Sequence, residues 1–120
     1  MDAQNLTQLA RTAARLYNCT FFITGKIDIV SDGKQTILLS GGDPRLCRIT
    51  GGGCMLSALC ALFCCSGASA FEAASTAGQL WKEISEEAGK RTDQNGGGIG
   101  QFHMSLMDMT EQKIYFSAYS

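Results

Sequence analysis

The chain has 120 residues, enough for one domain with one hydrophobic core. Hydrophobic residues make up 45% and charged residues 18%, a balance typical of globular proteins and unlike that of disordered ones. The formal net charge is −1 and there is no long basic block, so we expect no nucleic-acid partner. The longest apolar-rich run, residues 54–65, is shorter than the roughly 20 residues of a membrane-spanning helix, so we expect no membrane partner.

The N-terminal segment predicts a helix followed by a strand. Apolar side chains recur at helical spacing over residues 3–17, between Asp2, which can cap the helix, and Asn18, which can end it. Residues 19–24 form a short apolar run rich in β-branched and aromatic side chains. Such a run is typical of a parallel strand that is buried on both faces.

A hairpin and a short extended segment are predicted next. Residues 27–31 and 34–39 flank Asp32-Gly33, a pair that favours the positive φ angles of a type I′ turn. Because Asp32 has this turn role, we do not expect it to form a metal site with Asp28. A turn at residues 41–44 leads to a brief extended segment at residues 46–49.

The second half of the chain is predicted to be mainly helical. Residues 54–65 are apolar almost all round, which indicates a buried helix. Ser69 is a suitable cap for the next helix, on whose apolar stripe Trp81 is expected to be a core residue. A flexible glycine-rich loop is predicted at residues 93–100, and a helix or a strand from Phe102 onward.

Six cysteines occur, and four of them lie in one predicted helix: Cys54, Cys60, Cys64 and Cys65. Thiols on one helix cannot link distant parts of a fold, and no Cys-x-x-Cys pair is present. We interpret them as reduced, buried thiols of a cytoplasmic protein, a location that also fits a start unlike a signal peptide. A zinc site, with His103 as the single histidine, and a thiol-redox role are weaker alternatives.

The glycine run before the apolar helix is the main candidate site. Gly51, Gly52 and Gly53 are followed at once by Cys54. Successive glycine N–H groups can form an anion-binding nest, and the start of a helix adds a partial positive charge. That field favours the thiolate form of Cys54, which could accept a proton from a substrate hydroxyl. The alternative is a glycine turn that only feeds a buried helix, and the run is not a Walker A loop.

Residues 23–33 and residues 48–58, taken together, resemble hydroxyethylthiazole kinase of the ribokinase-like superfamily. Residues 98–102 also look like that family's late Gly-x-Gly-Ser/Thr-Phe element. The resemblance is to the C-terminal half of the kinase. It implies an α/β fold in which residues 1–120 form a single C-terminal segment of a ribokinase-like domain. This segment would be a partial three-layer α/β/α unit with a β-hairpin, and it would lack the N-terminal half of the family fold.

The resemblance also implies an activity and roles for individual residues. The family transfers the γ-phosphoryl group of ATP, with Mg²⁺, to the hydroxyl of 5-(2-hydroxyethyl)-4-methylthiazole in thiamine salvage. By this resemblance Thr24 contacts ATP and Gly51 contacts the thiazole alcohol. Gly51, Gly52 and Gly53 form the anion hole, and Cys54 stands where most ribokinase relatives carry an aspartate base.

One departure from the family pattern lies within the motif. The family usually has Gly-Thr-Gly-Cys, whereas this chain has Gly52 in place of the threonine. The missing half should carry most of the thiazole pocket and the acidic residues that organise Mg²⁺, so we expect no metal ligands within this chain. The resemblance further implies a homotrimer or association with a missing N-terminal half. The alternative is a non-catalytic nucleotide- or phosphate-binding module derived from the same fold.

Overall fold

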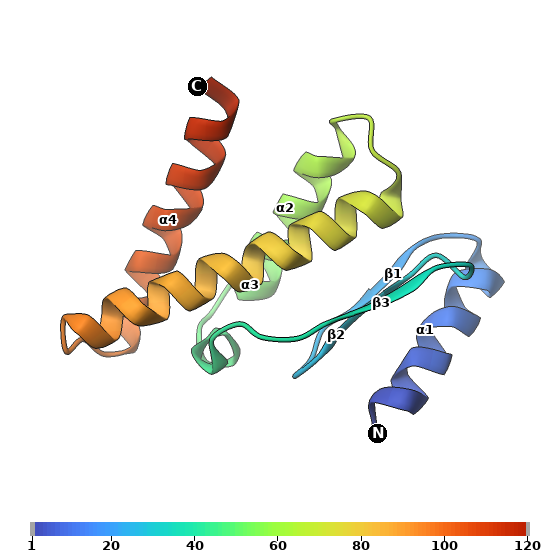
Figure 1. Ribbon diagram of the computed structural model, residues 1–120, viewed down its shortest axis with the longest axis horizontal. Helices are drawn as coiled ribbons and strands as arrows, with labels where there is room; N and C mark the ends of the chain where they lie inside the picture. The colour runs from blue at the N-terminus through green and yellow to red at the C-terminus, as the bar shows by residue number, and fades with distance from the viewer. Residues whose placement is uncertain (1, 120) are drawn as a thin grey trace. The chain divides into compact units, whose positions relative to one another are not determined.

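The structure is a computed structural model that describes residues 2–119, with side chains described as far as Ile114. It is a mixed α/β chain (Figure 1). In chain order its elements are α1 (Ala3–Tyr17), β1 (Phe21–Ile23), β2 (Asp28–Ser31), β3 (Thr36–Leu39), the 3-10 helix η1 (Pro44–Arg48), α2 (Gly52–Cys64), α3 (Ala70–Gln94) and α4 (Ile99–Tyr119).

The chain divides into two compact units, which are described in turn. The first unit contains the residues up to Gly41 together with Gly53–Gln79. The second contains Gly42–Gly52 together with the residues from Leu80 onward. The boundary therefore falls within the glycine run and again within α3.

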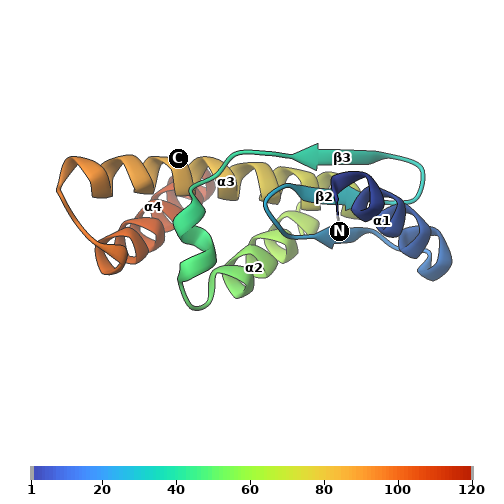
Figure 2. The same cartoon turned by 90° about the horizontal axis from the view of Figure 1, so that it is seen from below.

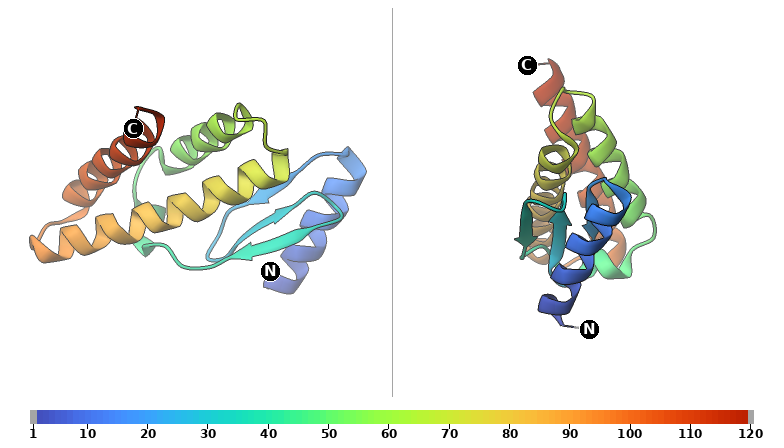
Figure 3. Two further views of the ribbon diagram at one scale, coloured as in Figure 1. Left: turned by 45° about the horizontal axis from the view of Figure 1, so that its top comes forward. Right: turned by 90° about the vertical axis from the view of Figure 1, so that its right-hand side faces the viewer.

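The first unit is built on a three-stranded antiparallel sheet in the order β1-β2-β3 (Figure 3). Phe22 of β1 lies opposite Val30 of β2, and Val30 lies opposite Ile37 of β3. The prediction of a parallel strand buried on both faces at residues 19–24 is wrong, because β1 is only half-buried and pairs antiparallel with β2. The connection from β1 to β2 is too short for a parallel crossover, which needs about a dozen residues or more.

Helix α1 packs against β1 and β2. The Asn5 backbone N–H donates to Asp2 Oδ1 at 2.8 Å, and Asn18 ends the helix in the left-handed region at φ 51. The predicted helix and both of its caps are confirmed. They are specified by residues that are neighbours in the sequence.

The other helix that covers the sheet is α3. Ser69 Oγ accepts from the Glu72 N–H at 3.2 Å, which confirms the predicted cap. The first turns of α3 place Phe71 and Ala74 in a buried cluster with Val30 and Leu39. Because side chains alternate along a strand, these strand residues lie on one face of the sheet.

The hairpin β2–β3 is confirmed, but its turn differs from the predicted one. The Asp32 N–H donates to the Gln35 carbonyl at 3.1 Å, so Gly33 and Lys34 are the two central residues. Gly33 has a φ of +92°, whereas a type I′ turn needs positive φ at both central positions. Asp32 lies outside the centre and accepts the N–H groups of Lys34 and Gln35 through Oδ1.

The second unit contains η1, the second half of α3 and α4. The predicted extended segment at residues 46–49 is wrong over Leu46–Arg48, which belong to η1. Asp43 caps this short helix and Pro44 opens it, a combination that favours helical over extended backbone. Trp81 is only 4% exposed, which confirms its core role, and Phe102 lies in a helix with no exposed surface.

Helix α2 is more exposed than its apolar sequence predicts. Leu56 and Leu59 are buried, but Leu62 is 48% exposed. The prediction of a fully buried helix is therefore wrong for this chain, because its described residues cover only one side of α2. No helix among residues 2–119 combines the length and the apolar character needed to cross a membrane.

Candidate functional site

The glycine run forms the start of α2. Gly51 has a φ of +88°, which a residue with a side chain adopts only at a cost, and the helix begins at Gly52. Cys54 is the third residue of the helix and its side chain is exposed. Figure 2 shows η1 running into this segment. Four predicted site residues therefore lie close together because they are consecutive at one helix start: Gly51, Gly52, Gly53 and Cys54.

The first N–H groups of an α-helix have no partner within the helix. In α1 and α3 the side chains of Asp2 and Ser69 accept from such groups. Gly51 precedes α2 and has no side chain that could do so. The N–H groups at the start of α2, with the partial positive charge of the helix, can therefore receive an anionic ligand.

The three glycines differ in the space around them. A Cβ atom placed on Gly51 or Gly53 would have no heavy atom within 4 Å, apart from neighbouring backbone. One placed on Gly52, which is buried, would lie 3.5 Å from the Leu46 carbonyl oxygen and 3.6 Å from Ile49 Cδ1. These are ordinary contact distances. Packing therefore does not require glycine at position 52, where the family usually has threonine.

All six cysteines are free. The expectation that they are buried is wrong: five are exposed and Cys60 is half-buried. Burial, with a smaller effect of Cys64, raises the pKa of the Cys60 thiol. Cys54 and Cys64 are exposed because α2 is covered on one side only, whereas Cys19, Cys47 and Cys65 lie outside this helix.

Thr24 lies apart from the glycine run in the sequence, directly after β1, and is exposed. The next residue, Gly25, donates its N–H to Asp28 Oδ1 at 3.0 Å, and Asp28 is buried at the start of β2. Asp28 thus stabilises the connection that carries Thr24. Within residues 2–119 no group of three or more His, Cys, Asp or Glu side chains could hold a metal ion.

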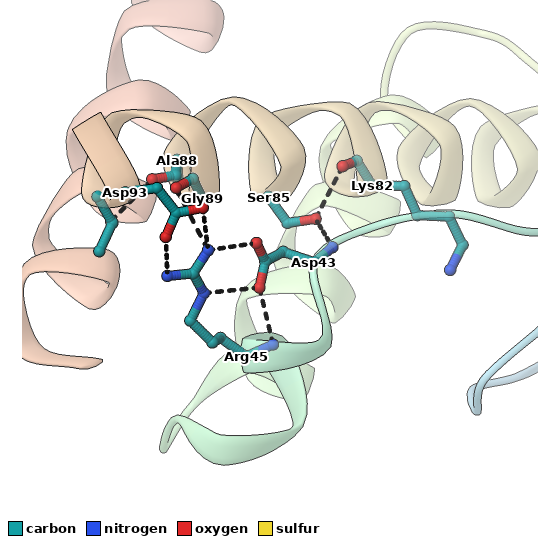
Figure 4. A network of polar contacts seen from close by, with 8 residues as sticks. Asp43, Arg45, Lys82, Ser85, Ala88, Gly89 and Asp93 are labelled. Carbon is teal, nitrogen blue, oxygen red and sulfur yellow. Dashed lines mark hydrogen bonds and ion pairs between the residues drawn. The ribbon is translucent and has the colours of Figure 1, made fainter. Parts of the chain in front are cut away.

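A polar network around Arg45 was not predicted from the sequence (Figure 4). Arg45 Nε and Nη2 donate to the two carboxylate oxygens of Asp43 at 2.9 and 2.8 Å. Arg45 Nη1 donates to Asp93 Oδ1 at 3.0 Å, and Nη2 donates to the Gly89 carbonyl at 3.3 Å. The guanidinium also lies 5.1 Å from the centre of the Phe102 ring. A single side chain thus links η1 to both α3 and α4.

The electrostatics of this network follow from its hydrogen bonds. The Arg45 guanidinium holds the pKa of the Asp43 carboxyl below its usual value. Asp43, with a smaller effect of Asp93, raises the pKa of Arg45. The Asp43 N–H donates to Ser85 Oγ at 2.9 Å. The Asp43-Pro44 pair signals a local helix start, but nothing near it in the sequence indicates the partners on α3.

A helix that starts after glycines in a mixed α/β chain is an arrangement that phosphate-binding α/β proteins use. The profile of the hydroxyethylthiazole kinase family matches residues 1–114. The chain therefore belongs to the hydroxyethylthiazole kinase family, and the resemblance drawn from its motifs is confirmed.

Individual relatives agree with this assignment. The chain is 43% identical over 100 residues to a hydroxyethylthiazole kinase of Clostridium botulinum (strain Alaska E43 / Type E3), covering 83% of this chain and 35% of the relative. It is 32% identical over 110 residues to that of Escherichia coli O6:K15:H31 (strain 536 / UPEC), covering 92% of this chain and 42% of the relative.

A solved structure is also similar. The structure of hydroxyethylthiazole kinase protein from Pyrococcus horikoshii OT3 matches with a TM-score of 0.65 and 33% sequence identity. The match covers 88% of this chain and 40% of that chain. This chain therefore spans less than half the length of the relatives that it matches.

Proposed function

We propose that this chain is the C-terminal segment of a hydroxyethylthiazole kinase and forms part of one ribokinase-like three-layer domain. The reaction is transfer of the ATP γ-phosphoryl group to the hydroxyl of 5-(2-hydroxyethyl)-4-methylthiazole in thiamine salvage. The observation that carries the proposal is the glycine start of α2, with positive φ at Gly51 and exposed Cys54 three positions on. Family membership supports the substrate.

In this reaction Cys54, as the thiolate, accepts the proton of the thiazole hydroxyl. The hydroxyl oxygen bonds to the γ-phosphorus while the bond from that phosphorus to the bridging oxygen breaks, and ADP leaves with the electron pair. The N–H groups of Gly51, Gly52 and Gly53 donate to the charge that develops on the transferred group. Thr24 contacts ATP and Gly51 also contacts the thiazole, as the resemblance implies.

The proposal divides the active centre between this chain and a further segment. Magnesium, when bound, neutralises charge on the phosphates of ATP. By the family resemblance, its acidic ligands are assigned to the N-terminal half of the kinase. The same half supplies most of the thiazole pocket, in a trimer or in a pair of complementary segments. Free thiols fit a cytoplasmic enzyme.

A reconstitution assay tests the proposal. The chain is mixed with the N-terminal half of a family member, and ADP release is followed with thiazole alcohol and Mg-ATP. We expect turnover from the mixture and little from either segment alone. No turnover from a mixture that forms a stable complex would contradict the kinase assignment. Nucleotide binding without transfer would then indicate a non-catalytic binding module.

Matched variants test the assigned residues. Cys54→Ala should lower turnover about 10²- to 10⁴-fold, the usual contribution of a general base. Cys64→Ala removes another exposed thiol of the same helix and should leave turnover almost unchanged. Equal effects would rule out Cys54 as the base. Gly51→Ala, which forces a side chain into positive φ, should lower turnover more than Gly52→Ala, which has room.

A further inference from the structure

We propose that Arg45 is a positioning residue: by joining η1 to α3 and α4 it fixes the backbone that begins α2. Arg45 does not take part in the chemistry and acts through η1. The structural part of this inference stands alone, and its consequence for turnover rests on the proposed function.

The network around Arg45 is largely shielded from water. The Arg45 and Asp43 side chains are 21% and 11% exposed. One side of the guanidinium faces Phe102, which has no exposed surface. Charge-assisted hydrogen bonds with two parallel contacts are stronger and more directional than single ones, and shielding from water strengthens them. Asp93, at 70% exposed, contributes less.

The network around Arg45 is connected to the start of α2 through the next residue in the chain. The residue after Arg45 is Leu46, whose N–H donates to the Asp43 carbonyl at 3.0 Å. The Leu46 carbonyl oxygen lies against Gly52, the first residue of α2, as does the side chain of Ile49. Gly52 is buried. The first residue of α2 therefore contacts the Leu46 carbonyl of η1. A shift of η1 moves the N–H groups at that helix start.

The geometry of the network requires arginine. Arg45 donates from three nitrogens to two carboxylates and a backbone carbonyl. Lysine carries a single ammonium group and cannot reproduce this planar pattern. We therefore expect Arg45→Lys to hold η1 in place less well than arginine does, but better than Arg45→Met does.

Hydrogen–deuterium exchange of the whole chain tests the structural part. Arg45→Met should speed exchange of residues 44–54 about tenfold, while α1, in the first unit, stays unchanged. Asp43→Asn keeps a capping oxygen while removing the charge, so it should give the same local pattern with smaller amplitude. Arg91→Met is the control, because it removes an exposed positive charge from the last turn of α3.

The outcomes separate positioning from general stabilisation. Faster exchange confined to residues 44–54 in both Arg45→Met and Asp43→Asn supports the inference. Equal acceleration in α1, or no change at residues 44–54, overturns it. If Arg45→Met does not fold, Asp43→Asn alone decides by the same two patterns.

A kinetic measurement on the reconstituted kinase adds a second criterion. Arg45→Met should lower kcat about tenfold and leave the KM for ATP within about twofold, because Arg45 acts through η1 on the N–H groups assigned to the transferred phosphoryl group. A raised KM with unchanged kcat would contradict positioning. If even the unmodified mixture shows no turnover, the proposed function fails, while the exchange experiment still decides the role of Arg45.

Discussion

Each unit contains a turn organised by an aspartate, and the two turns differ in reach. In the first unit Asp32 accepts N–H groups from Lys34 and Gln35. In the second unit Asp43 likewise accepts the N–H of the residue two positions on, Arg45. Lys34 and Gln35, which bind the Asp32 carboxylate, lie within three residues of it, whereas Arg45 extends the Asp43 turn to α3. The Asp32 turn is also tied to a helix, because its Gly33 carbonyl accepts from Arg15 Nε of α1 at 2.8 Å. The two motifs therefore differ in what the carboxylate itself does: that of Asp32 binds its own turn, and that of Asp43 binds the side chain that reaches α3.

The electrostatics reflect this difference. The pKa of Asp32 is lowered first by the backbone N–H groups of Gln35 and Lys34. The pKa of Asp43 is lowered first by the side chain of Arg45. Because Arg45 also binds α3, the pKa of Asp43 depends on a contact between segments that are distant in the sequence.

Gly89→Ala should break the Asp43 anchor outright. A Cβ atom on Gly89 would overlap Asp43 Oδ2 and would lie 2.9 Å from Arg45 Nη2. Alanine is a better helix former than glycine, but overpacking should outweigh this gain, with a net loss of about 2 kcal/mol in the free energy of unfolding. Urea unfolding followed by circular dichroism measures the change.

Gly100→Ala is the control for that substitution. Gly100 is also helical, in α4, and a Cβ atom there would have no heavy atom outside the adjacent backbone within 4 Å. We expect no loss of stability. If Gly89→Ala were as stable as Gly100→Ala, the close approach of Asp43 and Arg45 to α3 would be wrong.

Replacing each aspartate by alanine compares the two turns directly. Asp43→Ala removes the cap of η1 and leaves Arg45 without its main partner, so the free energy of unfolding should fall by about 1–2 kcal/mol after allowing for partial exposure. Asp32→Ala removes only local turn hydrogen bonds and should cost less. Thermal unfolding of both variants at neutral pH makes the comparison. An Asp32 variant that is the less stable of the two would reverse the contrast.

The same contrast explains what could be predicted from the sequence. The caps Asp2 and Ser69, the bounds of α1 and the existence of the hairpin were predicted, since each depends on residues a few positions apart. The start of α2 after Gly51 was close to its predicted place for the same reason.

Features that depend on distant segments could not be predicted. The exposure of α2 depends on which segments cover it, and helical periodicity says nothing about that. The antiparallel pairing of β1 is a different case, because its partner β2 follows it closely in the sequence and the short connection itself excludes a parallel crossover. The partners of Arg45 on α3, Gly89 and Asp93, each lie more than forty positions away. Sequence patterns record a side chain's local role but not its tertiary contacts.

The smallest expected effect on the free energy of unfolding comes from protonation of Asp43 in acid. The folded pKa of Asp43 is below its unfolded value of about 3.9, so its ionised form stabilises the fold fully above that value. This contribution is lost as the pH falls through the folded pKa. Asp43→Asn should therefore be less stable than the unmodified chain at pH 7 by about 1 kcal/mol, and the gap should narrow as the pH falls below about 3.9.

Urea midpoints at several pH values test this, with Asp32→Asn as the matched variant. Because the pKa of Asp32 is also lowered, its gap has the same sign and also closes in acid. Asp32 acts on its own turn alone, so its gap should be the smaller of the two at pH 7. A gap for Asp43→Asn that persists unchanged in acid would mean that the hydrogen bonds accepted by the carboxyl oxygens, and not their charge, hold η1 to α3. In that case the Asp43 turn would differ from the Asp32 turn in its hydrogen bonds and not in the charge of its carboxylate.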